Sequence, residues 1–365
     1  MSILDNIHIG ANKQQAVLNH LKTTPRPIVI FGAGIYAYVL HRYLTASAIP
    51  IAAVMVDSAY KTSETFEGSK VVTTEESVAS ISGYEIVIGT PNYPAAVANL
   101  ERLGATAIHL VDVPDFLNIP KPFMDIDFVR QNAASFDRAY ELFADDLSRA
   151  TYIAAINTKI NDDLEYIKPC VRLSHLYFSD EFPLSGDEVL LDVGGYTGDS
   201  VQDFIATTKG HYRGIISLEP FSASFEKLSA LVDALGRPDV TALKVGAWDQ
   251  KMTVPFATNP LDIDNRITGN GDRRIEVDTI DNILAGGDQI TFIKMDINGA
   301  EYRALSGARE TIRKSRPKIA VKLHVKEDLY RLPLLLKEIA PDIKLYLRQR
   351  NFMSMMLVLY GVFGS

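Results

Sequence analysis

Two apolar runs that each end in a group of glycines restrict the fold of this chain more than any other feature. The first, IVIFGAGIYA, spans residues 28–37, and the second, VLLDVGGYTGDS, spans residues 189–200. A buried strand that ends in a glycine-rich turn and leads into a helix is typical of a nucleotide-binding βαβ unit. The sequence therefore predicts one such unit in each half of the chain.

The segments around each glycine group alternate between apolar strands and amphipathic helices, which predicts parallel sheets with helices on both faces. In the first half we expect strands at 27–34, 49–57, 84–90 and 105–113, and helices at 8–24, 35–48 and 94–103. In the second half we expect strands at 188–194, 214–220, 240–248, 291–297, 318–325, 343–350 and 353–362, and helices at 200–208, 224–235, 300–315 and 326–340. The short connection between the last two strands indicates an antiparallel pair. The predicted class is α/β, with two doubly wound, Rossmann-like domains.

Domain boundaries follow from the break between the two series of strands. A proline-containing stretch at 113–123 ends the first series, and residues 127–168 have a helical pattern without strand signals. We therefore expect a Rossmann-like nucleotide-binding domain at 1–125, a helical linker region at 126–186 and a second domain at 187–365.

Charge and composition exclude several classes of partner. The chain has 37 Lys and Arg against 45 Asp and Glu, and we expect no nucleic-acid partner because such proteins usually present a basic face. Cys170 is the only cysteine, which excludes an internal disulfide and fits a reducing compartment. The N-terminus lacks the order of a signal peptide, and the apolar run at 353–363 is shorter than the about 20 residues of a membrane span. We expect a cytoplasmic protein.

The first glycine loop has the spacing of a dinucleotide-binding turn. Gly32, Gly34 and Ala37 form a G-x-G-x-x-A match, and Asp57 ends the next strand about 20 residues later, where an acid would bind a ribose. The loop predicts a second nucleotide site for NAD or a sugar nucleotide. The alternative is that the glycines only permit a tight turn.

The second glycine loop differs because Asp192 precedes its glycines and Asp199 follows them. Carboxylates would repel the pyrophosphate of a dinucleotide but suit a ligand with cationic groups and no phosphate, such as S-adenosylmethionine. Glu219 ends the following strand and could accept hydrogen bonds from both ribose hydroxyls. A capping or turn role is the alternative for Asp192.

These segments resemble the FkbM family of S-adenosylmethionine-dependent methyltransferases. The resemblance covers residues 187–350, through LLDVGGYTGDS, ISLEPFSASFEKL, LKVGAWD and ITFIKMDINGAEYRALSGARETIRKSRPKIAV in the order of the family. It implies a class I methyltransferase sheet and O-methylation, often of sugars in surface polysaccharides or of secondary metabolites. Two residues depart from the family pattern: Asn298 stands where Glu is usual, and Lys322 where an apolar or aromatic residue is commoner. The implied cofactor-binding residues are Asp192, Gly194, Gly195, Tyr196, Gly198, Asp199, Ser200, Glu219, Pro220, Phe221, Gly246, Ala247, Trp248, Asp296 and Glu301.

The candidate catalytic residues lie where the later strands of the second domain end. Lys294, Asp296 and Asn298 alternate along one predicted strand, and Asp296 is the first candidate for contact with the acceptor or with a metal; its alternative role is a helix N-cap. His324 is the candidate general base, because an imidazole titrates near neutral pH, or else a packed histidine. Glu301 would orient the cofactor or favour the helix N-terminus.

Other side chains leave alternatives open. Trp248 would flank the adenine or pack in the core. The seven histidines contain no H-x-x-H or H-x-x-x-H pair and there is one cysteine, so we assign no metal site and do not expect zinc. An oxygen-ligand metal at Asp296 stays open.

Two further functions compete with the methyltransferase. One is an NAD-dependent sugar-nucleotide oxidoreductase or epimerase, although none of the 16 tyrosines has Lys four residues later, the pair that such short-chain enzymes use. The other is a non-catalytic nucleotide-binding module, or a first domain that delivers the nucleotide part of the acceptor. The expected substrate is a small molecule or glycan, and the chain could form a homo-oligomer.

Overall fold

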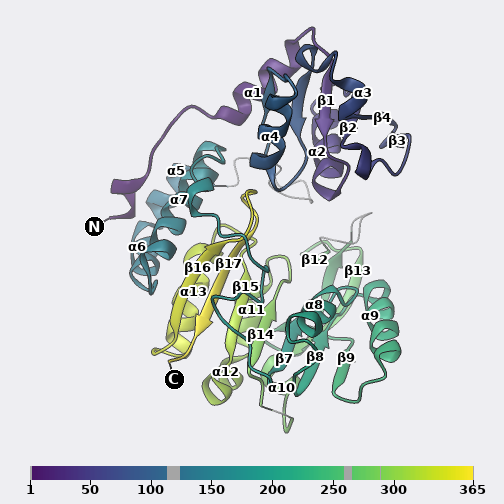
Figure 1. Cartoon of the computed structure of the whole chain (residues 1–365). Coiled ribbons are helices and arrows are strands. Elements are labelled where there is room, and N and C mark those ends of the chain that lie inside the picture. The colour runs from purple at the N-terminus through teal and green to yellow at the C-terminus, as the bar shows by residue number, and fades with distance from the viewer. Residues whose placement is uncertain (1, 113–123, 259–264, 288, 365) are drawn as a thin grey trace.

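The computed structural model describes residues 2–112, 124–258, 265–287 and 289–364, and it contains two α/β bodies joined along one side by a helical region (Figure 1). The proline-containing stretch at 113–123 lies outside the described residues. The predicted α/β class is confirmed, because each body is built around a mainly parallel sheet. The division into separately folding domains stays a prediction.

The N-terminal sheet has the strand order β3-β4-β2-β1-β5-β6, and its strands are parallel except for the β3–β4 hairpin. The sequence did not predict this hairpin, whose turn places both Glu67 and Gly68 at positive φ, as a type I′ hairpin turn requires. The strands are β1 (Ile28–Phe31), β2 (Ala53–Val56), β3 (Thr65–Phe66), β4 (Ser69–Thr73), β5 (Glu85–Ile88) and β6 (Ile108–His109). The helices are η1 (Ile3–Asn6), α1 (Lys13–Thr23), α2 (Ile35–Ala46), η2 (Ser58–Tyr60), α3 (Thr74–Ser77), η3 (Ile81–Gly83) and α4 (Tyr93–Arg102).

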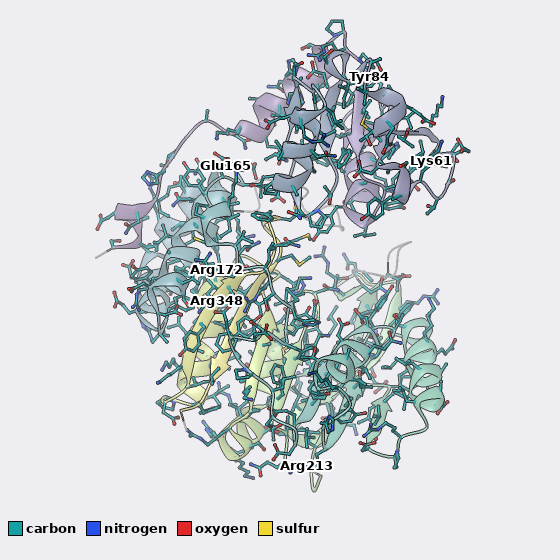
Figure 2. All side chains as sticks on the ribbon, in the orientation of Figure 1. Lys61, Tyr84, Glu165, Arg172, Arg213 and Arg348 are labelled. Atoms are coloured by element: carbon teal, nitrogen blue, oxygen red, sulfur yellow. The ribbon has the colours of Figure 1, made fainter. Side chains whose placement is uncertain are left out.

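The helical region follows as α5 (Ile126–Gln131), α6 (Ala133–Glu141), α7 (Asp146–Asn161) and η4 (Lys168–Cys170). It packs on the C-terminal body, with α7 against strand β16 (Lys344–Gln349). Arg348 of β16 fastens this contact through Asp145 at 2.6 Å and Glu181 at 2.7 Å, close to Arg172 in Figure 2. The helical region predicted as a linker at 126–186 therefore packs as a layer on the C-terminal body.

The C-terminal sheet has the order β16-β17-β15-β14-β7-β8-β9, and all its strands are parallel except β17, which is antiparallel to both β15 and β16. The predicted antiparallel end is thus confirmed. Its further strands are β7 (Val189–Val193), β8 (Gly214–Leu218), β9 (Val240–Leu243), β14 (Phe292–Met295), β15 (Lys318–Lys322) and β17 (Leu357–Val362). Its helices are α8 (Asp199–Thr207), α9 (Ser222–Leu235), α10 (Ile280–Ile283), α11 (Glu301–Ser306), α12 (Arg309–Ser315) and α13 (Asp328–Ile339).

Two predicted elements of the C-terminal half are each divided in the structure. The strand expected at 240–248 forms β9 and then β10 (Gly246–Trp248), which belongs to a separate sheet with β11 (Met252–Ala257), β12 (Arg266–Ile267) and β13 (Arg273–Thr279). The helix expected at 300–315 is broken between α11 and α12. Gly307 packs there so closely that a Cβ would lie 2.0 Å from the carbonyl oxygen of Trp248. A long-range contact therefore overrides the local helical pattern.

The two bodies meet near the carboxyl ends of their parallel strands. Asn351 donates to the hydroxyl of Tyr36 over 3.4 Å, and Ser354 donates to Asp112. Ile35, at the start of α2, lines a cavity that belongs mainly to the C-terminal body. Within the described ranges, no helix has both the length and the apolar character to cross a membrane.

Candidate active site

A cavity of about 430 Å³ lies at the carboxyl ends of β7, β8 and β14, where open α/β sheets bind their ligands. Its size falls in the usual range of small-molecule sites, about 300–1,000 Å³. The predicted site residues that line it are Gly194, Tyr196, Asp199, Ser200, Glu219, Pro220, Gly246, Ala247, Lys294 and Asp296. Those that do not line it are Asp192, Gly195, Gly198, Phe221, Trp248, Glu301 and His324.

The glycines of the second loop allow close packing more than direct contact with a ligand. Gly194 has φ +86°, and a Cβ there would lie 2.2 Å from the carbonyl oxygen of Asp296. A Cβ at Gly195 would lie 2.1 Å from the hydroxyl of Ser217, and one at Gly198 would lie 2.2 Å from Leu231. The loop can therefore lie against β14 and α9 only with glycine at these positions.

Asp192 does not present its charge to the cavity, contrary to the sequence-based expectation. Its carboxylate is fully buried, and it accepts hydrogen bonds from Ser217 at 2.7 Å and Ser200 at 3.1 Å. It also pairs with the ammonium of Lys294 at 2.9 Å, which donates to the carbonyl of Gly194 as well. The pair holds β7, β14 and the glycine loop together, and the acid of this loop that faces the cavity is Asp199.

Lys294 is buried by this pairing rather than free to meet an acceptor. Burial alone would lower the pKa of its ammonium, but Asp192 and Asp296 outweigh that effect and raise the pKa. Lys294 therefore stays charged, and it lies 5.3 Å from the ring centre of Tyr177.

Glu219 follows β8 and projects into the cavity with only 8% of its surface exposed. The amide of Tyr196 donates to Oε2 and the amide of Phe221 donates to Oε1, each at 2.9 Å. Burial nevertheless raises the pKa of this carboxyl to about 7. Each oxygen keeps a free lone pair, so the side chain can still accept two hydroxyl donors.

The cavity wall beyond Glu219 is mainly apolar. Gly246 and Ala247 of β10 line it, as the resemblance implies for the adenine side, together with Phe256 and Ile275 from the small sheet. Trp248 points elsewhere and carries the guanidinium of Arg303 5.1 Å from its ring centre, so it is not a wall of the cavity. Phe256 is an aromatic residue of this apolar part of the wall, a role that sequence reasoning missed.

Asp296 follows β14, lines the same cavity and is the centre of a charged cluster. It accepts a hydrogen bond from the hydroxyl of Tyr177, and its Oδ2 lies 3.4 Å from the ammonium of Lys322. Its Oδ1 lies 2.9 Å from Nε2 of His324. Burial would raise the pKa of Asp296, but Lys322 and His324 outweigh it and hold the pKa well below its usual range. Asp296 is thus an ionised acceptor and not a helix N-cap.

His324 lies behind Asp296, out of contact with the cavity. Its Nδ1 is 2.8 Å from Glu301 and its Nε2 is 2.9 Å from Asp296. Burial would lower the pKa of the imidazole, but the two carboxylates raise it to about 10. The ring therefore carries both protons near neutral pH and cannot accept another, which argues against the general-base role expected from the sequence.

Glu301 is a positioning residue in this arrangement. Its fully buried carboxylate accepts from the amides of Ile297 and Gly299 at 2.9 and 2.8 Å, which orders the turn before α11. The strand predicted to carry Asn298 ends at Met295, so alternation along a strand does not place this residue. Asn298 instead has φ +53°, a conformation that Asn tolerates better than Glu, and it lines the cavity.

The first glycine loop has the backbone of a nucleotide-binding turn. Gly32 has φ +115°, and Gly34 is the N-cap of α2 with open space where a Cβ would stand. Ala37 is fully buried against Gly89, where a Cβ would lie 2.9 Å away, so a small residue permits the approach of helix and strand. Asp57 follows β2 as predicted, and it accepts a hydrogen bond from Thr74 at 2.9 Å.

Two cavity residues, Tyr177 and Lys322, have roles that sequence reasoning did not assign. Tyr177 lies in the segment between η4 and β7, far from any motif, and only the fold brings it to Asp296. Lys322 was visible as a departure from the resemblance, because an ammonium follows the apolar residues Ile319–Val321 at the end of β15. A charged residue at the end of the strand that follows the Asp296 strand was the sequence signal that could have identified Lys322 as a site residue.

The comparisons with known proteins concern mainly the C-terminal body. Residues 192–353 match the family model described as methyltransferase FkbM domain. A crystal structure of methyltransferase FkbM from Methylobacillus flagellatus KT has a TM-score of 0.66 at 23% identity and covers 98% of this chain and 94% of its own. That likeness establishes a shared fold over nearly the whole chain.

Other solved structures are less similar. A SAM-dependent methyltransferase from Aquifex aeolicus has a TM-score of 0.31 at 16% identity, and covers 55% of this chain and 97% of its own. An rRNA methylase from Streptococcus thermophilus has a TM-score of 0.29 at 11% identity, with 50% and 90% covered. Both TM-scores are too low to support a structural comparison. The search of curated proteins found no match.

Proposed function

We propose that this protein, a methyltransferase by its FkbM domain at residues 192–353, transfers a methyl group from S-adenosylmethionine to a hydroxyl of a sugar, glycan or related metabolite. The family match confirms the predicted methyltransferase, and the donor and the acceptor are part of the proposal. One observation carries the proposal: Glu219 and Asp296 line the same cavity. Glu219 can still accept hydrogen bonds from ribose hydroxyls, and Asp296 is held ionised where it can bind the hydroxyl that receives the methyl group.

The chemistry of the donor set fits S-adenosylmethionine. Glu219 offers lone pairs to the ribose, and the apolar wall of Ala247, Phe256 and Ile275 suits the adenine. Asp199 faces the cavity and suits the cationic amino-acid part of a ligand without phosphate. When bound, this cofactor supplies the methyl group from a sulfonium that is already a good leaving group.

Asp296 would orient the acceptor hydroxyl and take its proton. Its low pKa makes it a weak base, but the acceptor oxygen becomes strongly acidic as it gains the methyl group, so a weak base suffices. Tyr177, Lys322 and protonated His324 fix the direction of the carboxylate. Each oxygen of Asp296 already faces a cation, Lys322 at Oδ2 and protonated His324 at Oδ1, which opposes a divalent metal there. A metal-dependent step is therefore the less favoured form of the proposal.

The first glycine loop of the N-terminal body would bind a nucleotide, either NAD or the nucleotide part of a sugar-nucleotide acceptor. The N-cap of α2 is Gly34, which makes no side-chain hydrogen bond to the amides of the first turn, and the next residue, Ile35, lines the methyl-transfer cavity. An acceptor held by its phosphates at this loop could therefore extend its sugar towards Asp296. A cytoplasmic location and a homo-oligomer stay predictions.

Calorimetry with S-adenosylhomocysteine tests the donor. We expect binding by the wild type, strongly weakened binding by Glu219→Ala, and unchanged binding by Glu226→Ala, because Glu226 is exposed on α9. Absence of binding by folded wild-type protein would overturn the proposed donor.

Transfer of a radiolabelled methyl group to sugars, sugar nucleotides and glycans tests the acceptor, and NMR of the product would identify an O-methyl group. Turnover only on amine or carbon acceptors would contradict O-methylation. A variant without residues 1–125 that keeps full turnover on the acceptor would contradict delivery by the N-terminal body.

A further inference from the structure

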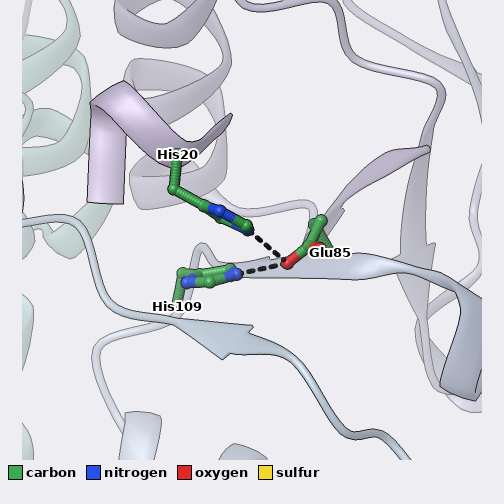
Figure 3. A group of neighbouring side chains, drawn as sticks. All are labelled: His20, Glu85 and His109. Atoms are coloured by element: carbon green, nitrogen blue, oxygen red, sulfur yellow. Dashed lines mark hydrogen bonds and ion pairs between the residues drawn. The ribbon is translucent and has the colours of Figure 1, made fainter. Parts of the chain in front are cut away.

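Two histidines and a glutamate that are remote in the sequence meet at the amino-terminal edge of the N-terminal sheet. His20 comes from α1, Glu85 begins β5 and His109 ends β6, and Figure 3 shows both imidazoles directed at the carboxylate. Nε2 of His109 lies 2.6 Å from Oε2 of Glu85, and Nε2 of His20 lies 3.3 Å from the same oxygen. One potential ligand atom from each residue falls within 4.8 Å of the others.

The glutamate is held so that one particular oxygen faces the histidines. Glu85 is 2% exposed, and its other oxygen, Oε1, lies 3.4 Å from Arg26 and accepts from the hydroxyl of Thr24 at 3.3 Å. Arg26 is itself fixed by backbone carbonyls, including that of Tyr84 at 2.8 Å. Outer partners of this kind orient the ligands of metal sites, and they leave Oε2 available.

We propose that His20, Glu85 and His109 bind a divalent transition-metal ion of the Zn²⁺ type. Two imidazole nitrogens and one carboxylate oxygen are a donor set that Zn²⁺ takes, with water in the fourth position. In a tetrahedral site with bonds of about 2.0–2.2 Å, ligand atoms lie about 3.3–3.6 Å apart. The pair from Glu85 to His20 already has this separation at 3.3 Å, and the pair from Glu85 to His109 reaches it by a small movement of one side chain.

Access and proton balance are compatible with an ion here. The side chain of His20 is 50% exposed, which leaves a path from solvent. Each neutral imidazole can donate its Nε2 proton to Glu85 when no metal is bound, and on binding that proton moves to Nδ1 and leaves the Nε2 lone pair for the ion. A second proton on either ring would compete with the metal, so the expected affinity falls as the pH is lowered.

The site would serve structure rather than methyl transfer. It lies at the amino-terminal end of β5, whereas the first glycine loop and the methyl-transfer cavity lie beyond the carboxyl ends of the strands. An ion there would connect α1 to both β5 and β6. This proposal stands independently of the donor and the acceptor.

Visible absorption of Co²⁺ added to the metal-free, full-length protein tests the site. We expect the intense bands of a four- or five-coordinate Co²⁺ ion at one equivalent, and their displacement by Zn²⁺. His20→Ala and His109→Ala should each weaken Co²⁺ binding by more than about 10-fold. His211→Ala is the matched control, because His211 is exposed on the other body, and it should bind as the wild type does.

Thermal unfolding separates loss of metal from loss of fold. The melting temperature of the wild type should rise with Zn²⁺ and fall back with a chelator, whereas that of His20→Ala should not respond, although circular dichroism shows it folded. Wild-type protein without the Co²⁺ bands, or bands that persist in both His20→Ala and His109→Ala, would overturn the proposal and leave a hydrogen-bonded cluster.

Discussion

Affinity for the cofactor should depend on the protonation of Glu219. Burial raises the pKa of this carboxyl to about 7 in the free protein, although two amides donate to it. Ribose hydroxyls donate hydrogen bonds, so they bind the ionised form better. The pKa lies above its ordinary value, and the binding-competent form is therefore lost as the pH falls below about 7.

The magnitude follows from the ionised fraction. With a pKa of about 7, about 9% of Glu219 is ionised at about pH 6 and about 91% at about pH 8, and the apparent Kd scales inversely with that fraction. The affinity for S-adenosylhomocysteine should thus rise about tenfold over this range, or about 1.4 kcal/mol. Calorimetry at several pH values measures it directly.

Glu219→Gln is the decisive control because it keeps the size and removes the titration. Its oxygen can accept from only one of the two amides of Tyr196 and Phe221, and its NH2 group then faces the other amide, donor against donor, so we expect weak binding that is flat with pH. Glu226→Gln should keep the wild-type slope. A wild-type Kd that is constant across this range, or an equal slope in Glu219→Gln, would refute the reasoning.

Four other substitutions test the cluster and the packing. Asp296→Asn should lower kcat about 100-fold or more in a radiometric assay with little change in cofactor Kd, because it removes the proton acceptor; near-normal kcat would contradict this role. His324→Gln should raise the pKa of Asp296 by removing a cation, so activity should fall at a higher pH than in the wild type, and an unshifted pH profile would exclude positioning by charge. Arg348→Met should lower the free energy of unfolding in urea by about 2–3 kcal/mol. This loss is smaller than for a fully buried ion pair, because the carboxylates of Asp145 and Glu181 are about one-third exposed. The matched control Arg213→Met should change the free energy of unfolding by less than about 0.5 kcal/mol. Gly194→Ala should cost about 1–3 kcal/mol in the same assay, because its Cβ would meet the carbonyl oxygen of Asp296, and unchanged stability would show that the loop can move.

The positions of the main strands, and the loops that follow them, could be predicted from the sequence. Gly194 and Glu219 each follow a short apolar run, and the carboxyl ends of neighbouring parallel strands meet at one edge of the sheet. Those rules are local or topological, and together with the family resemblance they placed ten of the expected residues at the cavity. They did not predict the separate strand β10 or the helix break at Gly307, because both depend on the close contact between Gly307 and Trp248 of β10.

The charge states of the site were decided by the tertiary structure alone. The sequence showed Asp192 and His324 as free acidic and basic groups, but the fold pairs the first with Lys294 and places the second between two carboxylates. It also brings Tyr177 to Asp296 across 119 residues of chain. Hydrophobic period and glycine spacing report the local backbone, whereas a pKa depends on charges within a few ångströms, whatever their distance along the chain. The sequence therefore determined where the cavity lies, and the packing of remote segments determined which of its groups can carry or accept a proton.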